Sequence, residues 1–362
     1  MISNLFIISY SLAFFFTGLS IYSNANKNKV LPFFLLFTIC LIIFAGFNTA
    51  SPDYMGYKGI ALAVGDYDDF YSGSSTELHG DFTFYVISSL VNSLGLDIQF
   101  VFIIISFISV GVTAYIVYKL SYNPMLSILL FSSHHYLNKD VIHIRTALSS
   151  AFLLLAIYIF TNRSKFWGVI SYIFSILSHS SSLITLPPIL FSQFFSKKNI
   201  TKILVLFLIL SFIINFIGGG FFGILQYIEP FLPSGVKNYL NWDIYNYDMG
   251  LLNLSLIRAL FFSCILILLF NKYEQTKEEI IFLFCYVFGT CILISFSDFA
   301  ILSGRLSSVL MSAEFIILVN ASSKLKNKKY ILFCLLFYSS ALLLNNILFS
   351  SYELGKFEFN LI

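Results

Sequence analysis

The chain has 362 residues, of which 58% are hydrophobic and only 11% are charged, and its formal net charge is +3. A water-soluble domain keeps about a quarter of its residues charged, so this composition excludes a cytosolic enzyme, a disordered chain and a small secreted protein held by disulfides. A nucleic-acid partner is not expected either, because the net charge is small and the chain has no polybasic arm. The sequence therefore predicts an all-α polytopic membrane protein, with residues 1–362 forming a single integral membrane domain.

Twelve apolar windows predict about 12 transmembrane helices. The first window has no basic residue before it and no small-residue cleavage site after it, so we expect it to be retained as a span. The windows 165–179 and 181–196 are short and include a Pro-Pro pair, so a hairpin that does not fully cross is an alternative for them. The twelve windows are 2–22, 30–48, 98–118, 123–138, 143–161, 165–179, 181–196, 200–217, 251–270, 279–297, 302–320 and 330–349.

Basic residues gather in alternate connections between these windows, which predicts the orientation of the chain. Placing those connections in the cytoplasm puts both termini outside. The connections hold 14 of the 21 basic residues, namely Lys27, Lys29, Lys119, Arg163, Lys165, Lys197, Lys198, Lys202, Lys272, Lys277, Lys324, Lys326, Lys328 and Lys329.

Two long loops, about 49–97 and 218–250, then fall on the outer side and hold most of the polar side chains. Within the first loop, the segment Phe82 to Leu94 is too short to span and suits an interfacial helix. We therefore expect function to face outward. The chain shows no internal repeat, which argues against a transporter built from inverted repeats.

Three of the four arginines, Arg145, Arg258 and Arg305, lie near the outer ends of predicted spans. An arginine within the membrane costs at least about 2.5–3.5 kcal/mol, so it is retained with a partner or for a purpose. The positive ends of the three helices point to the same outer surface, where an anion such as a diphosphate would be stabilised.

Structural pairing is the alternative for each arginine. Glu314 is a possible partner for Arg258 across the bundle. Asp140 and Asp298 are possible partners for the other two arginines.

The histidines give a weaker signal. His134, His135 and His143 border one outer connection, and His179 stands at the outer end of a window and is followed by three serines. No histidine pair has the spacing and intervening glutamate of a membrane metalloprotease, so we expect no metal. A lone histidine at a helix end is most often a hydrogen-bonded structural residue.

The first outer loop begins with Asp53 and Tyr54, and Tyr57 follows one helical turn later. A carboxylate beside aromatic rings suits sugar binding, because it accepts paired hydroxyls while the rings stack on C–H surfaces. The same residues also suit an ordinary interfacial tyrosine belt.

Three motifs in this order resemble the EpsG-like and Wzy-type polymerases of bacterial surface polysaccharides. They are Ser51 to Tyr54 with Tyr57, the run IRTALSSAF from Ile144 to Phe152, and LSHSSSLITLPP from Leu177 to Pro188. In that family an early outer loop carries an Asp-Tyr pair, an arginine opens a span, and a histidine followed by serines closes the next one. The motifs cover roughly residues 50–190.

The resemblance implies a glycosyltransferase of the bacterial inner membrane that joins undecaprenyl-diphosphate-linked oligosaccharides, such as O-antigen repeat units, at the periplasmic face. It carries over Asp53, Arg145 and His179 as catalytic residues. The topology argument adds Arg258 and Arg305 for substrate binding. Tyr54, Tyr57 and His135 complete the expected substrate-binding set. Expected partners are the lipid-linked oligosaccharide, membrane lipid and a chain-length regulator, with no cofactor.

Two other functions remain open from the sequence. An O-antigen ligase would also use outward arginines and a histidine, but would transfer to the lipid A core. A flippase or other transporter of lipid-linked oligosaccharides would concentrate its charges along a two-sided cavity. For the polymerase, either Asp53 or His179 is a candidate general base.

Overall fold

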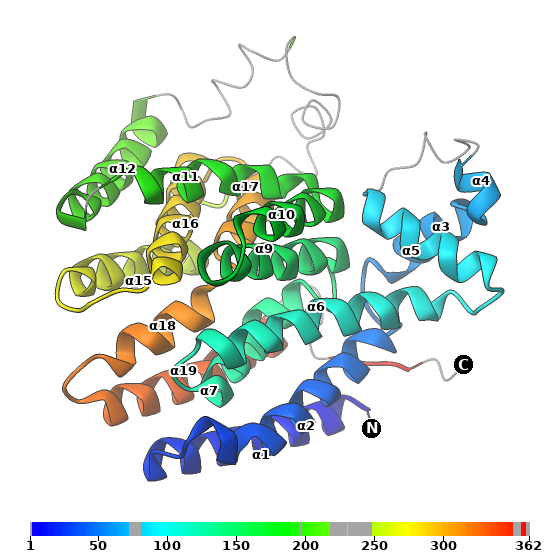
Figure 1. The fold of residues 1–362 in the computed structure, drawn as a ribbon, viewed down its shortest axis with the longest axis horizontal. Helices are drawn as coiled ribbons and strands as arrows, with labels where there is room; N and C mark the ends of the chain where they lie inside the picture. The colour runs from blue at the N-terminus through cyan, green and yellow to red at the C-terminus, as the bar shows by residue number, and fades with distance from the viewer. Residues whose placement is uncertain are drawn as a thin grey trace. The chain divides into compact units, whose positions relative to one another are not determined.

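The computed structural model of the chain describes residues 2–71, 81–195, 197–217, 230, 248–349 and 356–359 (Figure 1). These residues form helices and connections, and an isolated antiparallel bridge joins Asn48 to Phe359. Seven of the described helices are long and apolar enough to cross a membrane, or eight if one bent pair is counted as a span. The all-α membrane class expected from the composition is therefore confirmed.

The seven membrane-length helices coincide with predicted windows. Many of their apolar side chains, such as Leu12, Leu36 and Phe107, are exposed on the surface, as expected for groups that meet lipid. The helices are α1 (Ile2–Ser23), α2 (Lys27–Gly46), α6 (Gln99–Leu120), α9 (Ile144–Asn162), α12 (Lys197–Ile217), α16 (Lys277–Ser295) and α19 (Lys328–Phe349).

The other five windows form shorter or interrupted helices, so twelve full spans are not confirmed. The window 123–138 becomes α7 (Pro124–Leu130), the π-helical turn η1 (Phe131–His135) and α8 (Tyr136–Asn138). The window 302–320 is broken between α17 (Ala300–Leu310) and α18 (Glu314–Ser323), which bend by 52°. The remaining short elements are α10 (Lys165–Ser178), the 3-10 turn η2 (Ser180–Thr185), α11 (Leu186–Phe194) and α15 (Leu254–Phe270).

Much of the first expected outer loop is folded. It contains α3 (Tyr54–Ala63), α4 (Tyr67–Tyr71) and α5 (Phe82–Ser93). The buried faces of α3 and α5 share an apolar cluster with α6 and α9, which includes Phe84, Val101 and Leu148. The second expected loop, 218–250, lies outside the described residues except for residues 230 and 248–250.

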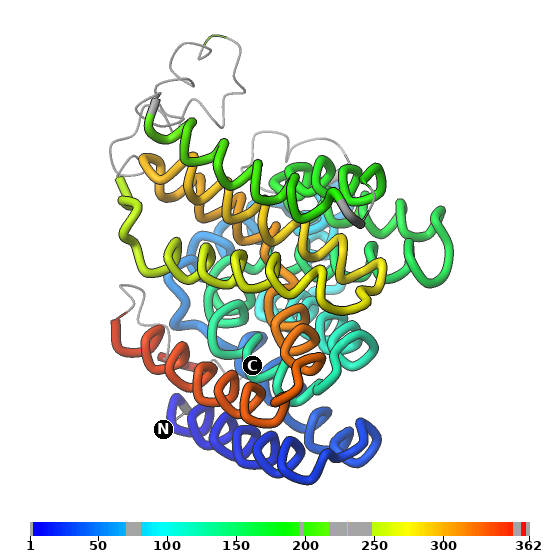
Figure 2. The backbone as a smooth tube through the Cα atoms, turned by 90° about the vertical axis from the view of Figure 1, so that its left-hand side faces the viewer, coloured from blue at the N-terminus to red at the C-terminus, as the bar shows by residue number. Residues whose placement is uncertain are grey.

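The helices belong to two compact units, one formed by Met1–Ser180 with Val319–Ile362 and the other by Ser181–Leu318. In the first unit, α9 packs between α6 and α10, and α6 also packs on α2. Helices α1 and α19, from opposite ends of the sequence, lie side by side (Figure 2). In the second unit, α16 contacts α11, α12, α15 and α17. A single domain over residues 1–362 stays a prediction.

Candidate active site

Four residues at helix boundaries carry the candidate site, and all belong to the first unit. Asp53, Asp81 and His143 immediately precede α3, α5 and α9, and His179 immediately follows α10. An aspartate immediately before a helix usually accepts a hydrogen bond from an N–H group in the first turn of that helix. Here Asp53, Asp81 and His143 make no such cap, and their side chains contact other elements instead.

The carboxylate of Asp81 joins two of the predicted catalytic residues. Its Oδ2 forms an ion pair with Arg145 Nη1 at 3.0 Å and lies 3.0 Å from His179 Nδ1. The three side chains are only 14% (Asp81), 24% (Arg145) and 20% (His179) exposed. An ionised carboxylate only accepts hydrogen bonds, so this contact with an ionised Asp81 requires a proton on Nδ1. The Nε2 atom of a neutral His179 ring is then free of a proton and able to act as a base.

A second carboxylate–imidazole pair stands nearby. Asp53 Oδ2 lies 3.1 Å from His143 Nδ1, and these side chains are 43% and 37% exposed. The pair is linked to the first through the chain, because His143 is two residues before Arg145. The structure thus brings the three expected catalytic residues into one region, with two further residues as their direct partners.

Tyr57 adds an aromatic wall to this region. The guanidinium carbon of Arg145 lies 5.3 Å from the centroid of the Tyr57 ring, a cation–π contact. The ring also packs against Phe84 of α5. Arg145 Nε is buried and has no hydrogen-bond partner among the described residues. The guanidinium is therefore fixed on one side by Asp81 and on one face by Tyr57, and its hydrogen-bonding capacity is not saturated.

Tyr54 and His135 lie in packed surroundings. The Tyr54 hydroxyl donates to Gln99 Oε1 at 2.8 Å, and the Gln99 amide in turn donates to the carbonyl of Gly46 at 2.7 Å. His135 is buried in η1, and its ring centroid is 5.4 Å from that of His134. These contacts give Tyr54 a role in fastening α3 to α6. Substrate binding by Tyr54, Tyr57 and His135 stays a prediction.

Asp140 is not the partner of Arg145. It lies in the connection before α9, where its Oδ1 accepts a hydrogen bond from Ser109 Oγ at 2.6 Å. The neighbouring Lys139 donates to Ser150 Oγ at 3.0 Å. Burial raises the pKa of Asp140 to about 7, against smaller opposite effects of the Ser109 hydrogen bond and the Lys139 charge.

The other two expected arginines belong to the second unit. Arg258 Nη2 lies 3.7 Å from Glu314 Oε2, and the two side chains are 14% and 6% exposed. The structural pairing considered for Arg258 is therefore confirmed. Arg305 lies within α17 and is partly exposed. Because Arg145 belongs to the other unit, a diphosphate site shared by the three arginines stays a prediction.

Sequence reasoning missed Asp81 and His143 as members of the site. The available signal was their position, since each stands directly before an apolar helical segment. Among the described residues, no group of three His, Cys, Asp or Glu side chains could hold a metal ion.

Comparisons with known proteins agree with the resemblance carried by the motifs. Residues 30–361 match the EpsG family. The amylovoran biosynthesis protein AmsC of Erwinia amylovora is 30% identical to this chain over 333 residues, which cover 85% of this chain and 84% of AmsC. No solved structure matches the chain.

Proposed function

This chain belongs to the EpsG family, and from that premise we propose that it is a polymerase of a bacterial surface polysaccharide. The relationship to a protein named for amylovoran biosynthesis supports polysaccharide synthesis. The proposed reaction joins undecaprenyl-diphosphate-linked oligosaccharide units, of O-antigen type, at the periplasmic face of the inner membrane. The observation that carries the proposal is the Asp81 carboxylate, which holds an arginine and a histidine at the same oxygen.

Glycosyl transfer from a lipid diphosphate needs two kinds of help. The bond between the anomeric carbon and the diphosphate oxygen breaks, and its electron pair leaves with the diphosphate. A hydroxyl oxygen of the acceptor sugar forms the new bond and loses its proton. Arg145 supplies positive charge for the leaving diphosphate, since hydrogen-bond donors that are already oriented stabilise charge as it develops.

His179 is the better of the two candidate bases. Its Nδ1 is held by Asp81 in a carboxylate–imidazole arrangement, which leaves Nε2 to accept the proton of the acceptor hydroxyl. Asp53 is more exposed and is paired with His143, so we assign it to the acceptor sugar's hydroxyls. Asp81 acts through its neighbours and is a positioning residue.

We propose that the reaction requires no divalent metal, because Arg145 provides the charge for the leaving group. The purified full-length protein, given lipid-linked repeat units extracted from cells, should elongate them in excess chelator. Loss of elongation that one specific metal restores would contradict this proposal.

The proposed orientation places the candidate site outside the cytoplasm. A cysteine at Lys58 should react with an impermeant thiol reagent in intact cells, in a background without the five native cysteines. A cysteine at Lys326 should react only after the membrane is opened. Reaction at Lys326 in intact cells would contradict the orientation.

Deletion of the gene distinguishes the proposed function from the alternatives. A polymerase mutant should keep lipopolysaccharide capped with one repeat unit, because ligation of single units continues. A mutant that loses even this single capped unit would favour a ligase or a flippase. In cells that keep this gene, long chains of uncontrolled length after deletion of a chain-length regulator would support that regulator as a partner.

A further inference from the structure

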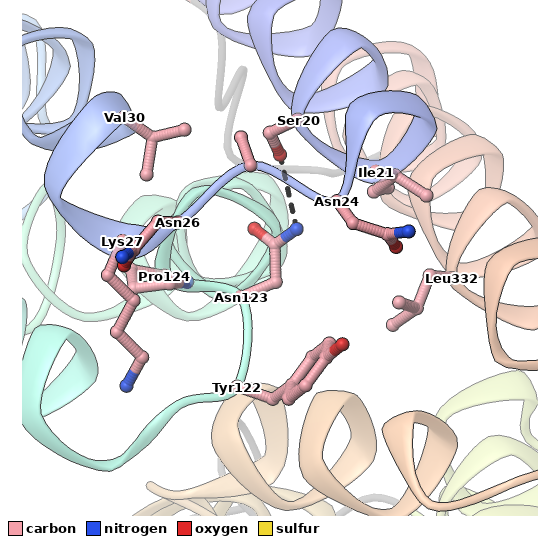
Figure 3. Close-up of a pocket in the computed structure, with 11 residues that line it drawn as sticks. Ser20, Ile21, Asn24, Asn26, Lys27, Val30, Tyr122, Asn123, Pro124 and Leu332 are labelled. Atoms are coloured by element: carbon pink, nitrogen blue, oxygen red, sulfur yellow. Dashed lines mark hydrogen bonds between the residues drawn. The ribbon is translucent and has the colours of Figure 1, made fainter.

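A pocket with a volume of about 330 Å³ lies in the first unit, where helix connections meet (Figure 3). The turn from α1 to α2 and the connection from α6 to α7 supply most of its walls, and Leu332 of α19 completes them. The polar lining consists of Ser20, Asn24, Asn26, Lys27, Tyr122 and Asn123. Because α1, α2, α6 and α19 have the length and composition of membrane spans, a pocket at their ends is expected at the level of the lipid headgroups.

The lining offers amide groups to a ligand. Asn123 is committed to the fold, since its amide donates to Ser20 Oγ at 3.2 Å and its oxygen caps α7 at Leu126 N. Asn26 immediately precedes α2 but makes no cap with its side chain. Asn24 adopts a left-handed backbone conformation with φ of 48°, which asparagine tolerates better than most residues. Asn24 and Asn26 are both exposed.

The surroundings of the pocket are strongly basic. The segments 20–30, 115–127 and 320–335 contain no Asp or Glu, and they contain seven lysines: Lys27, Lys29, Lys119, Lys324, Lys326, Lys328 and Lys329. The lysine contacts at the pocket are to uncharged groups. Lys27 donates to the Tyr118 carbonyl at 3.3 Å, and Lys328 donates to the Tyr122 hydroxyl at 3.1 Å. Lys329 donates to the Tyr22 carbonyl at 3.0 Å. These contacts orient the ammonium groups without neutralising them.

We propose that this pocket binds the phosphate-bearing headgroup of an anionic phospholipid. The lysines attract the phosphate, and the amides of Asn24 and Asn26 are donors for its oxygens and for the headgroup hydroxyls. Ile21, Val30 and Leu332 give the pocket apolar walls for the adjoining glycerol and acyl carbons. Lysines that only set the orientation of the chain in the membrane need to lie in short loops. They do not need a pocket whose polar lining is rich in amide donors, whereas a lipid headgroup site does. The site does not depend on the polymerase function.

An isosteric substitution tests the pocket without disturbing the fold. Asn26→Asp places a negative charge in the pocket, and aspartate is as good as asparagine at the residue before a helix. Ser164→Asp is the matched control. Ser164 also precedes a helix, α10, without a side-chain cap, and it lies in a different basic connection of the same unit. Both variants should unfold at the wild-type temperature in detergent, which checks that the fold is kept.

Native mass spectrometry of the full-length protein measures the binding directly. The probes are dioleoylphosphatidylglycerol, dioleoylphosphatidylcholine and inorganic phosphate. Wild type should retain phosphatidylglycerol in preference to phosphatidylcholine. Asn26→Asp should weaken phosphatidylglycerol binding by about fivefold, the effect expected for one charge at a membrane surface, and Ser164→Asp should leave it unchanged. Lys27→Gln combined with Lys328→Gln should weaken it by at least about tenfold.

Three results would overturn the proposal. One is an unchanged affinity for phosphatidylglycerol in Asn26→Asp, or an equal loss in both aspartate variants. Another is displacement of the lipid by inorganic phosphate at equal concentration, which would identify a free phosphate site. The third is that the mass spectrum shows an acidic protein segment bound in place of the lipid, which would identify a protein-binding site.

Discussion

Arg145 and Arg258 are both partly buried arginines paired with carboxylates, yet their surroundings differ. Arg145 meets Asp81 at 3.0 Å, and the same carboxylate oxygen also contacts His179. Arg258 lies 3.7 Å from Glu314, whose side chain is only 6% exposed. The first pair stands at the ends of helices beside a second carboxylate–imidazole pair, whereas the second joins α15 to the start of α18.

The difference shows that the position of an arginine near the end of a span does not identify its purpose. A buried pair suits the assembly of helices, because removal of either partner leaves a charge uncompensated. A pair that shares its carboxylate with an imidazole provides charge and a base together. We therefore propose a role in folding for Arg258 and in chemistry for Arg145, and this proposal replaces the expected diphosphate site shared by three arginines.

The largest expected effect is on stability. Arg258→Ala should destabilise the protein by about 3–5 kcal/mol, because Glu314 would stay buried without its cation. Thermal unfolding in detergent and the amount of protein in membranes measure the loss. Replacement of both residues by methionine should restore most of the stability, since apolar side chains of similar size tolerate burial. If Arg258→Ala is as stable as wild type, the pair is not structural.

The next effect is on activity. Arg145→Ala should reduce elongation by roughly a hundredfold or more, because a charge-assisted contact present in the transition state is lost. Cells should then carry lipopolysaccharide capped with single repeat units at a normal protein level. Full ladders in this variant, or absence of the protein from the membrane, would count against the assignment of chemistry to Arg145.

A smaller effect is expected at the positioning carboxylate. Asp81→Asn should lower the turnover number by about tenfold to a hundredfold, the range for a hydrogen bond to a charged group. The KM should change much less, because Asp81 orients other residues and does not bind the substrate itself. Asp53→Asn should mainly raise the KM for the acceptor. If Asp53→Asn instead lowers the turnover number and Asp81→Asn mainly raises the KM, Asp53 is the general base.

The smallest effect concerns Asp140 and pH. Burial raises its folded-state pKa from 3.8 to about 7, so the folded protein favours the protonated carboxyl more than the unfolded chain does. Wild type should therefore lose stability as the pH rises from about 4 to 7, whereas Asp140→Asn, which does not ionise, should not. The unfolding temperature of the variant relative to wild type should rise by several degrees between pH 5 and pH 8. A difference independent of pH would refute this.

The sequence located helical segments well and full spans poorly. Hydropathy measures composition over a window and is insensitive to a break in the backbone. The π-helical turn at 131–135 and the bend of 52° between α17 and α18 therefore lie inside windows that read as continuous. The Pro-Pro pair in the first turn of α11 was a visible signal, and α11 is indeed short.

The candidate site was predictable in its motifs and unpredictable in its pairings. Asp53, Arg145 and His179 stand in recognisable runs, but Asp140, the carboxylate considered as a possible partner of Arg145, is not the one that pairs with it. Several acidic residues of the first expected outer loop offer the same chemistry as Asp81. The choice among them depends on how α5 packs against α10, where Ser178 donates to Thr83 at 3.2 Å. Such a contact between distant segments leaves no trace in local sequence.

The same substitution at both arginines tests the central claim most directly. Lysine keeps the charge but loses the planar, multiple-donor geometry of the guanidinium. In elongation of lipid-linked repeat units by purified full-length protein, Arg145→Lys should be impaired nearly as much as Arg145→Ala, and Arg258→Lys should retain near wild-type activity per folded molecule. Equal activity of the two lysine variants would contradict the assignment of chemistry to Arg145 and of folding to Arg258.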